Sequence, residues 1–187
     1  GGAVNDSEGM KGFVIKFKPD GEVHWKKMYN AVNFWKISSL QLPYSFFVAG
    51  SMNKNGKTAA VVYQIGLDGK IKSTFSFPAS GNSFGTGFDV DSNRNIYITG
   101  YLFGDFVSGG AIPPTGKDSK EKSDIFVGVF DIVTSKLLFS TVSGSEKYDV
   151  NPKIVVNNNV PYLSYYSVED LTSSSGETHI SIFENNE

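Results

Sequence analysis

Four oxygen-bearing side chains follow one another at every second residue near the middle of the chain. They are Asp89, Asp91, Asn93 and Asn95, in the run D-x-D-x-N-x-N. Carboxylate and amide oxygens at this spacing resemble the ligand pattern of calcium loops. The glutamate and glycine that complete such loops are missing, and the segment also reads as an ordinary turn. The sequence therefore leaves a calcium site and a structural turn open, and it indicates no other cofactor.

Asp89 is also a candidate for acid–base chemistry. Gln41 and Val155 stand at its aligned positions in the other repeats, and Asp149 follows a matching loop one repeat later. Two carboxylates that meet in space can act as acid and base. The chain has no cysteine, no Gly-x-Ser-x-Gly elbow and no phosphate-binding loop, so nucleophilic catalysis lacks its usual groups. We assign no catalytic residue and expect binding rather than catalysis.

Tyrosines toward the end of the chain offer a third kind of site. Tyr162, Tyr165 and Tyr166 are followed by Glu169 and Asp170. Such a surface suits glycans, because sugar faces stack on rings while sugar hydroxyls donate hydrogen bonds to carboxylates. Alternate residues of a strand point to opposite faces, so Tyr162 and Tyr166 share a face that Tyr165 does not. These two are candidates for glycan contact, and core packing is the alternative.

A long polar insertion lies at residues 106–123 and reads FVSGGAIPPTGKDSKEKS. It is longer than a hairpin connection. Long loops on rigid scaffolds often carry binding residues, so Lys117 and Lys120 are candidate ligand contacts, and a plain surface loop is the alternative. Asp118 and Glu121 balance the lysines, so no basic patch results.

Composition and charge limit the class of protein. The 187 residues are 40% hydrophobic, which is enough for a sizeable core. The 14% aromatic residues, 20 glycines and 7 prolines are typical of many short strands and tight turns. A net charge of -2 gives no positive field for nucleic acid. No apolar run approaches the roughly 18 residues of a membrane span, so we expect neither nucleic acid nor membrane insertion.

Short apolar runs joined by turns fill the chain from residue 13 onward. In the first of them Phe13, Ile15 and Phe17 alternate with other residues before the turn Pro19-Asp20-Gly21. The same hairpin, with strands C and D, recurs at 13–29, 61–77 and 126–142. A second hairpin lies between the copies, with A strands at 37–42, 87–91 and 153–156 and B strands at 46–51, 96–101 and 160–165. With a last C strand at 178–183, the sequence predicts about thirteen strands.

The spacing of these hairpins indicates a β-propeller. Equivalent points at Phe17, Ile65, Phe130 and Phe183 are 48, 65 and 53 residues apart. Four strands in about 40 to 50 residues is the period of one four-stranded antiparallel blade, and the insertion explains the longest spacing. We therefore expect an all-β propeller segment at residues 13–187, with blade hairpins at 13–29, 37–77, 84–142 and 151–183. Residues 1–12 are expected to lie outside it, as a disordered or added segment.

The chain also resembles the bacterial β-propeller repeats known as SBBP repeats. The matching residues are Val90-Asp91, Ile96-Tyr97-Ile98-Thr99-Gly100 and Asp124-Ile125-Phe126-Val127-Gly128-Val129-Phe130-Asp131, with Phe13 to Phe17 and Gly21 to Trp25 in the first hairpin. Arg94 departs from the pattern, because the family turn usually has glycine there. The resemblance implies four-stranded blades and covers nearly the whole chain after residue 12. Propellers of this kind serve diverse and mostly non-catalytic functions.

About three blades are fewer than the four to eight of a closed propeller. Uncovered blade faces and free strand edges are avoided in solution. We therefore expect part of a larger propeller, completed by another segment or by a homo-oligomer.

The expected function is a non-catalytic binding or scaffold module of a bacterial cell-surface, periplasmic or secreted protein that recognises protein or glycan through its loops. One alternative is a carbohydrate-active enzyme, a hydrolase or lyase with carboxylates at the channel mouth. Another is a purely structural assembly segment.

Overall fold

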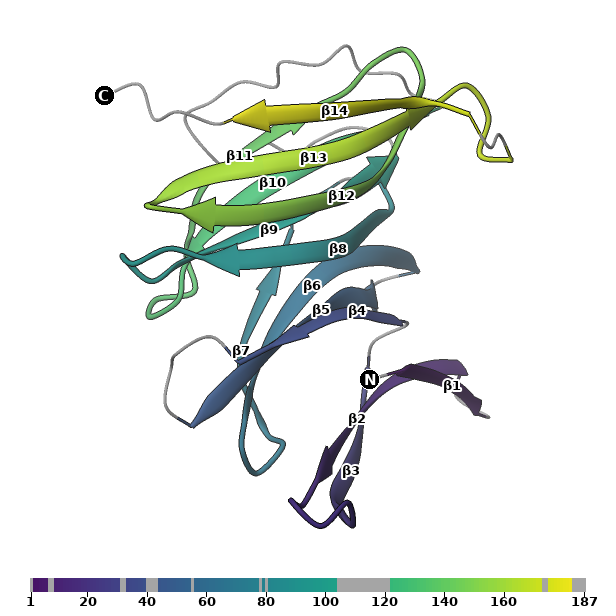
Figure 1. The fold of residues 1–187 in the computed structure, drawn as a ribbon. Helices are drawn as coiled ribbons and strands as arrows, with labels where there is room; N and C mark the ends of the chain where they lie inside the picture. The colour runs from purple at the N-terminus through teal and green to yellow at the C-terminus, as the bar shows by residue number, and fades with distance from the viewer. Residues whose placement is uncertain are drawn as a thin grey trace.

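The chain folds into β-strands throughout the part that the structure describes. This computed structural model describes residues 2–6, 9–30, 33–39, 44–54, 56–77, 79, 81–103, 122–172 and 175–182. These residues form fourteen strands in four antiparallel sheets, which follow one another along an open arc (Figure 1). Nowhere in these ranges is there a helix long and apolar enough to cross a membrane.

Each sheet is a meander of consecutive strands, and we call the sheets blades 1 to 4. Blade 1 contains β1 (Gly2–Asp6), β2 (Gly9–Phe17) and β3 (Val23–Tyr29). Blade 2 contains β4 (Asn33–Ser38), β5 (Ser45–Lys54), β6 (Lys57–Gly66) and β7 (Ile71–Ser76). Blade 3 contains β8 (Ser83–Val90), β9 (Asn95–Phe103), β10 (Ser123–Asp131) and β11 (Leu137–Ser143). Blade 4 contains β12 (Tyr148–Asn157), β13 (Val160–Val168) and β14 (Glu177–Ile182).

The predicted all-β, blade-forming fold class is confirmed. Strands A, B, C and D are β4 to β7 in blade 2 and β8 to β11 in blade 3, while β12, β13 and β14 are strands A, B and C of blade 4. The described strands do not close a ring. One strand is additional, since β1 pairs with β2 from Gly2 opposite Phe13 to Asp6 opposite Gly9. It lies among residues 1–12, where the sequence GAVND shows no alternation that would indicate a strand.

The turns between C and D strands use local hydrogen bonds and left-handed residues. Gly21 and Gly69 have φ angles of 88° and 76°, which glycine adopts without a steric cost. Asp68 Oδ1 accepts a hydrogen bond from the Lys70 amide at 3.0 Å. Arg94 lies in the turn between A strand β8 and B strand β9 and also has a positive φ of 65°. This turn therefore uses a left-handed residue that is not glycine.

Packing of one blade on the next forms the core. Phe47 of β5 and Phe88 of β8 are fully buried, with ring centroids 6.0 Å apart. Phe77 stacks on Phe126 at 3.8 Å. The buried cluster continues through Phe75 of β7 and other residues of blades 2 and 3. Since burying one large apolar side chain contributes about 1.5–3 kcal/mol, this contact supplies much of the stability of the fold.

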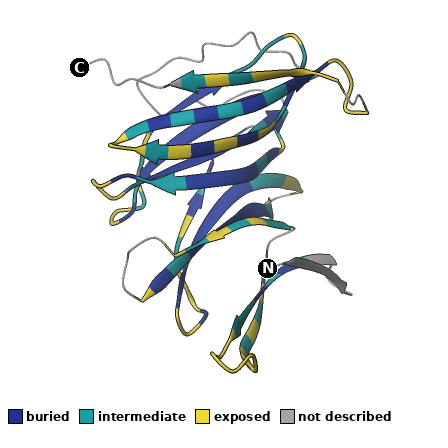
Figure 2. Cartoon of the chain, in the orientation of Figure 1, coloured by how far each residue is buried: buried dark blue, intermediate teal, exposed yellow. Residues whose placement is uncertain are grey.

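The same strand positions form the contact at each step along the arc. B and C strands of blade 2 present Phe47, Ala49 and Val62 to blade 3. The equivalent residues of blade 3, Tyr97 and Val127 among them, pack with Ile154, Leu163 and Tyr165 of blade 4. Figure 2 shows the buried residues concentrated in the middle blades and more exposed residues on the outermost ones. Every inner blade is thus covered on both faces, and the terminal blades are covered on one.

We predict that this packing between blades determines stability. Leu163 is 1% exposed against blade 3, whereas Leu138 of β11 is 48% exposed. Leu163→Ala is expected to lower the free energy of unfolding by about 2–5 kcal/mol, because it leaves a cavity. Leu138→Ala, the matched control, is expected to change it by less than about 1 kcal/mol. Urea denaturation with an unchanged m-value measures both, and equal losses would contradict the prediction.

Candidate functional site

The A strands β4, β8 and β12 lie in neighbouring positions on three successive blades (Figure 1). Hydrogen bonds join them across the blade boundaries. Lys36 Nζ donates to the carbonyl of Phe88 at 2.6 Å, and Thr86 Oγ1 donates to the carbonyl of Pro152 at 2.8 Å. The sequence placed its candidate carboxylate Asp89 on one of these strands, so this row is where the predicted site is tested.

Asp89 is half-buried and is held by backbone amides. Its Oδ2 accepts a hydrogen bond from the Val156 amide at 2.7 Å, and its Oδ1 accepts one from the Val90 amide at 3.0 Å. A carboxylate paired with amides in this way links strand β8 to strand β12, because Val156 belongs to the next blade. Burial lowers the pKa of the neighbouring Lys36, while the carboxylate of Asp89 opposes this and the charge of Lys153 adds to it.

Asp91 is 8% exposed and stabilises the turn between β8 and β9. Its Oδ1 accepts from the Asn95 amide at 2.8 Å, and its Oδ2 accepts from Asn95 Nδ2 at 2.8 Å and from the Tyr97 hydroxyl at 3.3 Å. Burial, the charge of Asp91 and this hydrogen bond raise the pKa of Tyr97 to about 12. The pattern of Asp91 is that of a structural turn.

The calcium site at Asp89, Asp91, Asn93 and Asn95 stays a prediction. Asp89 turns toward β12 and Asp91 toward its own turn, while Asn93 is exposed. In the described ranges no three His, Cys, Asp or Glu side chains are grouped as metal ligands.

The carboxylates Asp89 and Asp149 do not meet. Asp149 is fully buried and accepts hydrogen bonds from the Ser145 amide at 2.6 Å and from the Ser167 hydroxyl. Strands β8 and β12 run in the same direction, with Thr86 beside Pro152 and Asp89 beside Val156. Asp149 lies about six residues before Asp89 in this register, which at about 3.3 Å per residue is roughly 20 Å. The pair that an acid–base mechanism would need is not formed.

Tyr162 and Tyr166 share one face of β13, and Tyr165 lies on the other, as the alternation predicts. Tyr165 is buried and stacks on His179 with centroids 4.8 Å apart. Tyr162 and Tyr166 are half-buried and stand at the positions that Tyr97 and Tyr101 occupy in blade 3. Those positions pack against the following blade. The candidate residues Lys117 and Lys120, by contrast, lie outside the described residues.

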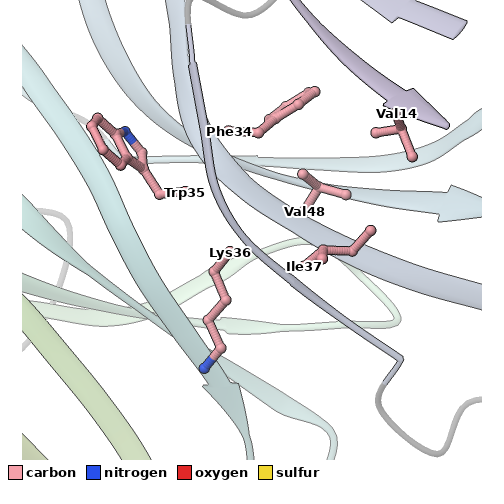
Figure 3. A pocket seen from close by; sticks show the side chains of 6 residues that line it. All are labelled: Val14, Phe34, Trp35, Lys36, Ile37 and Val48. Atoms are coloured by element: carbon pink, nitrogen blue, oxygen red, sulfur yellow. The ribbon is translucent and has the colours of Figure 1, made fainter. Parts of the chain in front are cut away.

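Sequence reasoning missed a set of residues at the start of the A strands. Trp35, Thr86 and Asn151 lie at irregularities where β4, β8 and β12 shift register against their B strands. Figure 3 shows Phe34 and Ile37 on one side of β4, toward Val14 and Val48, and Trp35 and Lys36 directed to the other side. In the sequence, the sign of these residues was only that the alternation of apolar residues stops at them. For that reason the predicted A strands began just after them, at Ile37, Gly87 and Lys153.

We predict that Asp89 is a structural residue. Asp89→Ala removes the acceptor of the Val156 amide, and a half-buried amide left without a partner is expected to cost about 1–2 kcal/mol in the free energy of unfolding. Asp89→Asn keeps one acceptor oxygen and is expected to cost less. Urea denaturation compares the two variants, and a stability of Asp89→Ala equal to that of the native chain would contradict the prediction.

Comparison with known proteins identifies one family. No curated protein matches the chain. Residues 64–101 match the model of the SBBP family, described as a β-propeller repeat. The match runs from the end of β6 through β7 and β8 into β9, so it crosses from the outer strands of blade 2 to the inner strands of blade 3. The resemblance seen in the sequence is confirmed: the chain carries an SBBP β-propeller repeat at residues 64–101.

Proposed function

We propose that this chain is a non-catalytic binding and scaffold module, built from β-propeller blades, that recognises a protein or glycan partner. The observation that supports it is the use of the acidic side chains. Asp89, Asp91 and Asp149 each accept hydrogen bonds from neighbouring amides or hydroxyls, and Asp89 joins consecutive blades through the Val156 amide. These carboxylates stabilise the scaffold. We place the module at a bacterial surface, in the periplasm or outside the cell, as the bacterial repeats that it resembles suggest.

A direct test separates binding from turnover. The native chain and Asp89→Ala are incubated with a panel of neutral and acidic oligosaccharides, and products are followed by chromatography while retention is followed by affinity electrophoresis. We expect retention of some panel members without any product, in both proteins. Product formed by the native chain and lost in Asp89→Ala would establish the carbohydrate-active enzyme instead.

The terminal blades expose faces that the inner blades bury. In blade 4, Ile180 is 76% exposed and Val155 is 55% exposed, on the same face as Tyr162 and Tyr166. By register Ile180 is equivalent to Val127, which is 2% exposed because blade 4 covers it. The apolar contact that stabilises each boundary between two blades is therefore not formed on the outer face of blade 4.

Blade 1 exposes the complementary face. Phe17 is 57% exposed and Met28 is 45% exposed, and Phe13 and Ile15 beside them are half-buried. The equivalent positions of blade 2 include Val61, Tyr63 and Ile65, which pack against blade 1. One chain thus carries both halves of a blade boundary. A second copy bound head to tail would cover both faces and bring the number of blades to eight, within the range of about four to eight found in closed propellers.

The oligomeric state tests this part of the proposal. By light scattering we expect the native chain to have twice the mass of one chain, because a dimer closes both faces. Ile180→Asp is expected to reduce the mass to that of one chain, since it places a charge in the contact.

Val133→Asp is the matched control, because Val133 is 72% exposed in the turn between β10 and β11. It is expected to leave the dimer intact. A native chain that stays monomeric would contradict the dimer and would leave another polypeptide segment as the candidate for covering the two faces.

A further inference from the structure

Three consecutive blades carry a β-bulge at the same place in the A strand. The pairing of β4 with β5 shifts between Phe34 and Lys36, so that Trp35 is the extra residue. The pairing of β8 with β9 shifts between Gly85 and Gly87, around Thr86. The pairing of β12 with β13 shifts between Val150 and Lys153, around Asn151 and Pro152. A bulge leaves its extra residue outside the ladder and changes the direction of its side chain.

The bulges are held firmly. In blade 3 a Cβ added to Gly100 would lie 1.9 Å from the carbonyl oxygen of Phe84, so only glycine permits this approach of β9 to β8. Thr86 Oγ1 donates across the blade boundary to Pro152. Asn151 has a positive φ of 54°, which is uncommon outside glycine. Side chains at the bulges therefore project from a fixed backbone.

The bulge residues of all three blades meet at one cavity of about 310 Å³. Trp35, Thr86 and Asn151 line it together with the rings of Phe84, Tyr101 and Phe103. Phe84 and Tyr101 stack with centroids 5.0 Å apart and planes 18° apart, and Phe103 meets both rings edge-on. Trp35 is 57% exposed. The cavity thus combines a wall of packed aromatic rings with one large indole that is more than half exposed.

The polar side chains of the cavity can each donate a hydrogen bond. Lys153 lines it and is exposed, and Asn151 supplies a side-chain amide. Burial raises the pKa of Tyr101, so its hydroxyl stays protonated at neutral pH. Among the described residues that line the cavity there is no carboxylate. Asp89, whose charge acts on the neighbouring Lys36, has oxygens that already accept hydrogen bonds from backbone amides.

We propose that this cavity is a sugar-binding site that prefers an acidic sugar, a uronate residue of a glycan. The proposal rests on the glycan side of the function proposed above and gives it a location. C–H groups of a sugar ring carry partial positive charge and are attracted to the negative face of an aromatic ring, which suits Trp35. Sugar hydroxyls pair with Asn151 and Tyr101, and the uronate carboxylate pairs with Lys153. The volume is at the lower end of small-molecule sites and fits one or two sugar residues.

Other ligand chemistries fit the cavity less well. A cation would gain from the aromatic faces but would be repelled by Lys153. An apolar side chain would gain from the rings but would make no use of Asn151 and Lys153, which are exposed and stay hydrated. An acidic sugar satisfies both the rings and the donors.

The test compares cellobiouronic acid with cellobiose, two disaccharides that differ in one carboxylate. The chain has two tryptophans, and in a ¹⁵N-labelled sample their indole N–H signals separate the cavity from the rest of the protein. Trp25 donates its indole N–H to the carbonyl of Leu67 at 3.0 Å and lies outside the cavity. We expect the Trp35 signal to shift with the acidic disaccharide, with a Kd on the order of 1 mM, and the Trp25 signal to stay.

Variants assign the binding to the cavity. Trp35→Ala lacks the reporting indole, so its binding is followed by the backbone amide signals of Asn151 and Lys153, which line the same cavity. It is expected to weaken binding of both sugars at least about tenfold. Lys153→Gln is expected to weaken binding of the acidic sugar about fivefold and to leave cellobiose unchanged. The matched controls are Tyr44→Ala, a 72% exposed aromatic residue, and Lys136→Gln, an exposed lysine. Both controls are expected to bind as the native chain does.

Three outcomes would overturn the proposal. One is no shift of Trp35 with either disaccharide; another is equal affinity for the two, which would remove the acidic preference. A third is retention of the native chain and Trp35→Ala by the same glycans with equal strength. In that case the glycan site lies elsewhere, and the proposed binding function stands without this cavity. A chain retained by no glycan and no protein would remove the binding function as well.

Discussion

Burial of one sheet face by the next sheet is the interaction on which this structure depends. A four-stranded sheet has two faces, and an isolated blade would expose apolar residues on both. Phe47, Ala49 and Val62 of blade 2 become core residues only because Phe88 and its neighbours in blade 3 cover them. Blade 3 then offers Tyr97 and Val127 to blade 4 in the same way. The free energy of unfolding is therefore approximately a sum of contributions from the contacts between neighbouring blades, as in other repeat proteins.

A second constraint follows at the inner edge of each blade, where the A strand has a neighbour on one side alone. Free amides of an edge strand need partners, and side chains of the adjacent blade provide them. Asp89 accepts from the Val156 amide, and Lys36 and Thr86 donate to carbonyls across the same boundaries. In the sequence, polar residues on the A strands therefore look like a functional site. In the structure, they form hydrogen bonds between blades that would otherwise meet through apolar contacts alone.

Much of the fold could be predicted from the sequence, because strand alternation and turn residues are local signals. Phe13, Ile15 and Phe17 and the turn at Gly21 define a hairpin without reference to the rest of the chain, and the repeat period then gives the blade. Strand β1 escaped prediction because its residues have no alternation and pair through the backbone. The site was harder to predict. That Asp89 faces Val156, and that Asp149 lies far from it, depends on the register between blades, which no local pattern records.

The bulges show where a repeated scaffold can vary. Ladder positions must fill the same space in every blade, so Phe47 and Tyr97 are both large, and Gly50 and Gly100 both allow the close approach of the A strand. A bulged residue is outside the ladder and is free of that requirement, and the three blades place Trp35, Thr86 and Asn151 there. These three residues differ from blade to blade, and their side chains leave the sheet and line one cavity. A scaffold made of similar units can carry different side chains at one place in this way, because the constraint that repeats the blades does not act on these positions.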